Sequence, residues 1–137
     1  MDEKGRLNLP SVLRQALDLH GVGTLVLSCY GESIWAWTPE DYARDVEARV
    51  AEQDQFSAST MDFVHALCSL AQDAEVDKAG RIRLPVELRE EAGIGKDVVV
   101  FTTPNHVEIW NAEAWRRRLT EARGRIATRL SGEGGAA

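Results

Sequence analysis

A thirteen-residue segment occurs twice in this chain, at residues 2–14 and again at residues 77–89. Chance at ordinary residue frequencies would give about one identity between two such segments. The likeness resumes downstream, where Trp37 corresponds to Trp110. Because an internal repeat constrains the architecture more than any local signal, we expect a tandem of two similar units. Seven of the thirteen positions are identical, namely Asp2/Asp77, Gly5/Gly80, Arg6/Arg81, Leu9/Leu84, Pro10/Pro85, Leu13/Leu88 and Arg14/Arg89.

The same series of elements is predicted in both units. Each begins with an Asp-x-x-Gly-Arg turn, in which Asp accepts backbone hydrogen bonds and Gly supplies a positive φ. Alternating apolar and polar residues then indicate a short strand, and the proline that follows suits the first turn of a helix. Thr38 and Asn111 open later helices as capping residues do. Two further strands are predicted in each unit, at residues 24–28 and 33–37 and at residues 97–102 and 106–110.

Strands this short cannot bury enough apolar surface as separate units, so the two copies should pack on each other. We therefore predict an α+β fold in which two pseudo-repeated β-α-β units form one β-rich barrel core with flanking helices. Residues 71–76 could form a hairpin with residues 81–84, whereas Met1 stands directly before Asp2 and leaves the first unit without such an arm. The predicted divisions are a first unit at 1–42, a helical segment at 43–70, a second unit at 71–115, and a C-terminal helix with a disordered tail at 116–137.

The net charge of −6 is unevenly distributed. Residues 38–75 carry nine acids against two arginines, whereas residues 113–129 carry six arginines against two glutamates. Local field matters more for binding than the total charge does, so the acidic segment argues only against DNA contact by that segment. No apolar run is long enough to span a bilayer and no secretory signal opens the chain, so we expect no membrane association and a cytoplasmic location.

The sequence gives no sign of enzymatic chemistry. Cys29 and Cys68 are far apart, and His20, His65 and His106 are scattered without metal-ligand spacing. No nucleophile with a neighbouring base and no phosphate-binding glycine loop is visible. We therefore expect no catalytic residues, no metal and no cofactor.

The repeated motif resembles that of the MraZ family, which lies in the AbrB-like (SpoVT-AbrB, swapped-hairpin) superfamily. The resemblance extends from Asp2 to about Arg118, and its motif is a doubled Asp-x-x-x-Arg, here Asp2 to Arg6 and Asp77 to Arg81. It implies two AbrB-like units in a nucleoid-associated transcriptional regulator. The resemblance further implies binding to short direct repeats in the promoter of the chain's own operon, in the bacterial division and cell-wall gene cluster, by a ring of subunits. The chain differs from the family in lacking its usual strand before the first motif.

Two explanations for Arg6 and Arg81 remain open. The turn could hold each guanidinium outward, where it can bind a phosphate or a guanine edge, or each could form an ion pair within its own turn. The repeat and the resemblance together favour DNA contact, more strongly for Arg6. The further candidate DNA contacts are Lys4, Lys78, Arg14 and Arg83.

Assembly is expected from an apolar stripe on the last predicted helix, from Trp115 to Leu130. Head-to-tail contacts that close would give a homo-oligomeric ring. An alternative function is a non-enzymatic ring-forming protein-interaction module, in which the acidic segment binds a protein partner. Salt separates the two hypotheses, because DNA binding weakens steeply with ionic strength through counterion release.

Overall fold

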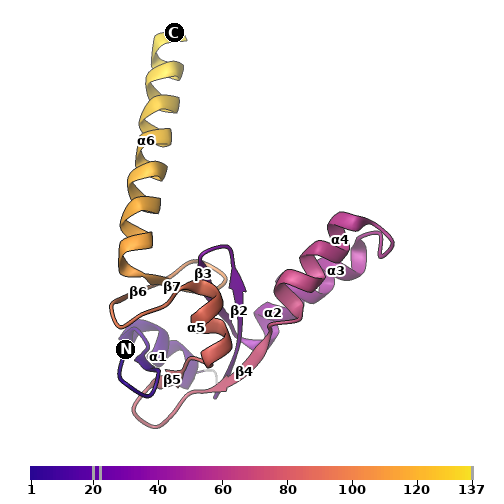
Figure 1. Ribbon diagram of the computed structural model, residues 1–137, viewed down its shortest axis with the longest axis vertical. Helices are drawn as coiled ribbons and strands as arrows, with labels where there is room; N and C mark the ends of the chain where they lie inside the picture. The colour runs from indigo at the N-terminus through magenta and orange to yellow at the C-terminus, as the bar shows by residue number, and fades with distance from the viewer. Residues whose placement is uncertain (20, 22, 137) are drawn as a thin grey trace.

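The computed structural model describes residues 1–19, 21 and 23–136. It is an α+β fold in which both repeats form the same succession of elements (Figure 1). The first repeat contains β1 (Arg6–Asn8), α1 (Ser11–Leu19), β2 (Thr24–Tyr30) and β3 (Ser33–Trp37). The second contains β5 (Arg81–Arg83), α5 (Val86–Ala92), β6 (Val98–Thr102) and β7 (Val107–Asn111). Gly93 ends α5 in the left-handed conformation, which is typical of glycine after the last turn of a helix.

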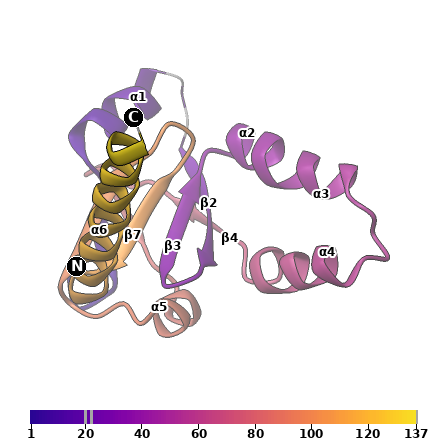
Figure 2. The same ribbon diagram turned by 90° about the horizontal axis from the view of Figure 1, so that it is seen from above.

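A helical hairpin, here called the arm, follows the first repeat at residues 39–68 and projects from the body (Figures 1 and 2). Thr38 caps its first helix, because the side-chain oxygen accepts from Asp41 N at 3.1 Å. The outgoing limb is α2 (Pro39–Tyr42), the π-helical η1 (Ala43–Glu47) and α3 (Ala48–Glu52), and the return limb is α4 (Ala58–Phe63) and the π-helical η2 (Val64–Cys68).

The long helix α6 (Ala112–Ala136) follows the second repeat and leaves the body on its own (Figure 1). Asn111 caps it as predicted, since its side-chain oxygen accepts from Glu113 N and Ala114 N. The helix continues through residues 131–136, for which the sequence predicts a disordered tail. Extending an established helix adds one backbone hydrogen bond for each residue fixed, which permits this continuation despite the poor composition.

The strands form a two-stranded ribbon, β1–β5, and a five-stranded sheet of order β4-β2-β3-β7-β6. The prediction that residues 71–76 pair with residues 81–84 is wrong. This segment forms β4 (Gln72–Glu75), which adds to β2 with Ala74 opposite Leu25, while β5 pairs with β1. The reason is burial, since this register places the Ala74 side chain in the core beside Leu25.

The two repeats are related by a pseudo-two-fold axis. In the ribbon, Leu7 lies opposite Ile82, its counterpart in the other repeat. In the large sheet, β3 pairs with β7 so that Trp35 lies opposite Glu108, again equivalent positions. The copies therefore pair strand against strand, which confirms that they pack on one another. One core of buried aliphatic residues from both repeats joins the ribbon to the sheet, including Leu7, Leu9, Leu25, Leu27, Ile34, Ile82, Leu84, Leu88 and Ile109.

Each repeat also holds the turn of the other through an arginine. The Arg14 side chain crosses the second turn, where its Nη1 donates to the Ala79 carbonyl at 3.0 Å. A Cβ at Gly80, which has a φ of 76°, would lie only 1.9 Å from Arg14 Cδ. Arg89 lies in the same way over Gly5, where a Cβ would be 2.9 Å from its Cζ. Glycine is required at both turns, both for the positive φ and for the close approach of this arginine.

We predict that Gly80→Ala destabilises the protein more than Gly31→Ala does. Both glycines have positive φ, but no atom lies within 4 Å of a Cβ at Gly31, so that variant carries only the conformational cost of about 1–2 kcal/mol. Gly80→Ala must also displace Arg14, which adds overpacking of about 1–3 kcal/mol. Urea unfolding of the two variants measures the difference, and equal midpoints would contradict the packing argument.

Candidate nucleic-acid interface

The two Asp-x-x-Gly-Arg turns have the same hydrogen-bond pattern. In the first, Asp2 Oδ1 accepts from the backbone nitrogens of Lys4 and Arg6 at 3.0 and 2.8 Å, and Oδ2 accepts from Arg6 Nε at 2.7 Å. In the second, Asp77 Oδ1 accepts from the backbone nitrogens of Ala79 and Arg81 at 2.9 Å each, and Oδ2 accepts from Arg81 Nε at 2.9 Å. One carboxylate therefore shapes the backbone of each turn and orients the arginine that ends it.

These contacts stabilise the charged form of both carboxylates. The hydrogen bond from the Arg6 backbone nitrogen is the largest cause that lowers the pKa of Asp2 below its ordinary value of 3.8, and the Arg6 side chain adds to it. The pKa of Asp77 is lowered in the same way by the backbone nitrogen and side chain of Arg81. Each aspartate is thus a permanent part of its turn at neutral pH.

The ion pair engages only Nε of each arginine. The terminal atoms Nη1 and Nη2 of Arg6 and Arg81 form no hydrogen bond with the described residues of the protein. Those two nitrogens can bind a phosphate or the O6 and N7 atoms of guanine. The two explanations left open by the sequence are compatible, because the aspartate orients a guanidinium whose outer edge stays free.

The ribbon brings the predicted basic residues together. Leu7 and Ile82 point into the core, so the alternate positions of both strands lie on the outer side. Arg6 is paired with Arg83 across the ribbon, and Asn8 is paired with Arg81. Like charges directly opposite each other are destabilising in an antiparallel pair, so a face with three arginines is suited to a polyanion.

The remaining candidates take different places. Lys4 and Lys78 are exposed in the turns at the two ends of the ribbon. Arg14 is half-buried against the second turn through its bond to the Ala79 carbonyl, a role in holding the turn that the sequence did not suggest. Its contact with DNA stays a prediction.

Asn8 is a potential contact that the sequence analysis missed. It is exposed on the same face as Arg6, and an asparagine amide can bind the N6 and N7 atoms of adenine. The repeat could have pointed to Asn8 as a candidate, because Asn8 is equivalent to Arg83 and both occupy the last position of their strands.

The described residues, which do not include His20, give no indication of a metal site or of a membrane-spanning helix. Over these residues, no three His, Cys, Asp or Glu side chains gather as metal ligands. No described helix has both the length and the apolar composition needed to cross a membrane.

The ribbon and its turns define a two-repeat α+β protein with a basic, outward-facing antiparallel β-ribbon. A protein family described as "MraZ protein, putative antitoxin-like" matches this chain at residues 1–64 and 67–129. The chain belongs to the MraZ family.

Similar proteins carry the same family name. A "Transcriptional regulator MraZ" from Syntrophobacter fumaroxidans is 35% identical over 84% of this chain and 76% of its own length. The protein of that name from Methylobacillus flagellatus is 32% identical over 88% of this chain and 82% of its own. One from Treponema denticola is 29% identical over 89% and 83%. The resemblance drawn from the doubled motif is thereby confirmed.

We predict that the double variant Asp2→Asn/Asp77→Asn loses stability relative to the parent at neutral pH but not in acid. A carboxylate whose folded pKa is lowered stabilises the fold above its unfolded pKa, and this contribution disappears as the pH falls through the folded value. The difference in urea midpoint between parent and variant should therefore shrink as the pH falls below about 3.8. Asp62→Asn, in an exposed part of the arm, is the control. A difference independent of pH would contradict this role.

Proposed function

We propose that this chain is a sequence-specific DNA-binding transcriptional regulator whose β1–β5 ribbon contacts double-stranded DNA. The observation that carries the proposal is the outer face of the ribbon, where Arg6, Arg81 and Arg83 lie together with Asn8. The major groove of B-DNA admits a two-stranded β-ribbon, and Arg and Asn are the side chains that bind guanine and adenine bidentately. The names of the related proteins support the regulatory role.

The proposed target is a set of short direct repeats in the promoter of the chain's own operon, in the bacterial division and cell-wall gene cluster. This detail rests on the family resemblance. The corresponding location is the cytoplasm, in association with the nucleoid. A ring of subunits would present several ribbons to successive repeats, and the effective concentration of the second ribbon would raise the affinity above that of one alone.

The alternative is a protein-interaction module without a DNA ligand. The acidic arm is the observation that favours it, with seven acids against two arginines over residues 39–68. DNA binding through several arginines should weaken steeply between low and moderate salt. Binding that is insensitive to salt would favour the alternative.

We predict that Arg6→Ala lowers affinity for promoter DNA while the fold and the oligomer persist. Loss of a bidentate base contact costs about 1–3 kcal/mol per subunit. Mobility shifts should compare the DNA upstream of the gene with a scrambled duplex of equal length. A base contact weakens only the cognate duplex, whereas a phosphate contact weakens both. Arg44→Ala is the matched control, because Arg44 also forms an ion pair with an aspartate, Asp41, but lies on the arm. Equal binding by variant and parent on both duplexes would remove Arg6 from the site.

We predict a homo-oligomer for the parent protein in solution. The apolar residues Ile126 and Leu130 on α6 are 51% and 62% exposed, which favours burial against another copy. Light scattering at micromolar concentration measures the mass directly. A mass of 15.2 kDa, that of one chain, would overturn the proposed assembly.

A further inference from the structure

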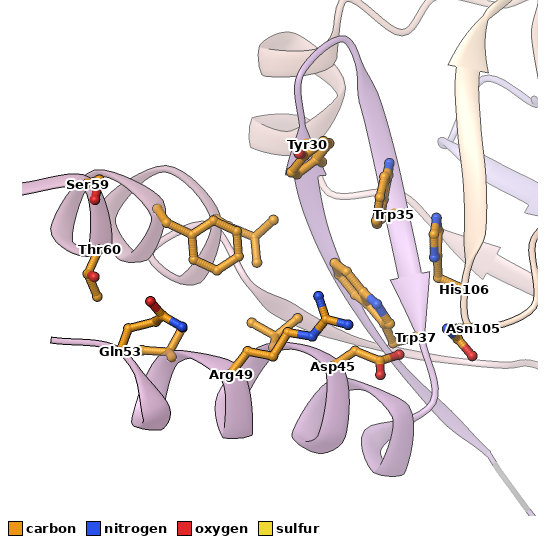
Figure 3. Close-up of a pocket in the computed structure, with 14 residues that line it drawn as sticks. Tyr30, Trp35, Trp37, Asp45, Arg49, Gln53, Ser59, Thr60, Asn105 and His106 are labelled. Atoms are coloured by element: carbon orange, nitrogen blue, oxygen red, sulfur yellow. The ribbon is translucent and has the colours of Figure 1, made fainter. Parts of the chain in front are cut away.

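The pseudo-two-fold axis gives the outer face of the sheet two equivalent pockets. The first, of about 480 Å³, lies between the sheet and the arm, with Trp37, Asp45 and Val46 in its lining (Figure 3). The second, of about 500 Å³, lies between the sheet and α6, and its lining includes Trp110, Arg118 and Leu119. These three residues are the repeat equivalents of the first three, each 73 positions further along the chain.

The two pockets differ in how they are covered. The return limb of the arm folds back over the first pocket and brings Phe63 and Leu67 into its lining, and Leu67 is buried there with Trp37 and Val46. Among the described residues, α6 has no return limb, and it extends from the body alone (Figure 1). The second pocket therefore lacks the apolar cover that the same fold supplies at the first.

The second pocket has an aromatic floor, and the charged residues in its lining are Arg118 on α6, Glu32 on the turn between β2 and β3, and Glu108. Trp115 lies 4.6 Å from Phe101 and 5.4 Å from Trp110 between ring centroids, and Tyr30 lies 4.6 Å from Trp35. Arg118 provides the positive charge where the equivalent position of the first pocket is Asp45. Glu108 in the floor is already engaged, because it accepts from Trp110 Nε1 at 2.9 Å and lies 3.0 Å from His106 Nε2.

The tip of the arm has an exposed aromatic side chain beside acids, which can meet the aromatic floor and Arg118. Phe56 lies between α3 and α4 and is 98% exposed, the highest value among the exposed large apolar side chains of the described residues. Glu52 and Asp54 flank it and are exposed. The arm and α6 leave the body at separate places and diverge in both views, so the arm tip lies away from α6, the helix that lines the second pocket of the same chain (Figures 1 and 2).

We infer that the arm tip of one copy docks into the second pocket of the next copy, with Phe56 against the aromatic floor and the acids beside Arg118. This contact rests on the assembly proposed above and assigns its surfaces. It is heterologous, since two different surfaces meet, so it leaves a free arm and a free pocket at the ends of any open chain. When successive contacts of this kind return to the first subunit, the assembly is a closed ring.

Single substitutions at exposed positions test this contact without disturbing the fold. Phe56→Ala should convert the oligomer to a species with the mass of one chain in light scattering, with an unchanged far-ultraviolet circular dichroism spectrum. Val12→Ala, on the 77% exposed Val12 of α1, is the control and should leave the oligomer intact. Arg118→Glu should dissociate the oligomer as well, whereas Arg117→Glu, adjacent but outside the pocket lining, should not.

A mixture of the two dissociated variants tests the contact between arm and pocket most directly. The Phe56→Ala chain keeps a working pocket and the Arg118→Glu chain keeps a working arm, so the mixture should form a one-to-one dimer and nothing larger. An oligomer that survives both substitutions would overturn the contact while leaving the assembly standing. Variants that dissociate yet never combine would also overturn it. A parent protein that is itself a monomer would remove the assembly and this contact together.

Discussion

The pairing of β1 with β5 is the contact on which the rest of the protein depends. Each strand is three residues long, and neither has another strand partner in the described part of the chain. The pair places Leu7 and Ile82 together in the core and fixes their neighbours on the outer face. Because Arg14 holds the second turn and Arg89 lies over the first, the geometry of each turn requires the helix of the other repeat. A single unit would lose its core and the geometry of its turn together.

The two repeats have the same structure where they contact each other, and they differ in the helices that follow them. Thr38 and Asn111 begin helices at equivalent places, immediately after the equivalent tryptophans. The first helix becomes an acidic hairpin that covers its own pocket, and the second becomes a basic helix that leaves its pocket open. The two helices thus give the chain two different surfaces, an arm tip and an open pocket, and a head-to-tail contact between identical chains requires two different surfaces.

Local signals in the sequence predicted local features well. Asp2 and Asp77 shape their turns as expected, and Thr38 and Asn111 cap helices, because each of these features depends on neighbours within a few residues. Features set by distant partners were missed. The placement of β4 beside β2 and the position of Arg14 over Gly80 depend on contacts about fifty or more residues away, for which no local pattern exists. Asn8 was overlooked as a candidate because only its pairing with Arg81 on the opposite strand places it beside the arginines.

The layered arrangement also separates the acidic arm from the arginines of the ribbon, which makes the net negative charge compatible with the proposed binding of DNA. The ribbon packs on one face of the large sheet through the main core, while the arm packs on the other face through Trp37, Tyr42, Val46 and Leu67. Packed sheets are separated by about 10 Å, and charges in physiological salt are screened over about 8 Å. The acids of the arm therefore contribute little field at the ribbon, where the arginines dominate. In the proposed assembly the contacts between subunits would lie on one face of the sheet and the ribbons on the other, so assembly and DNA binding would not compete for surface.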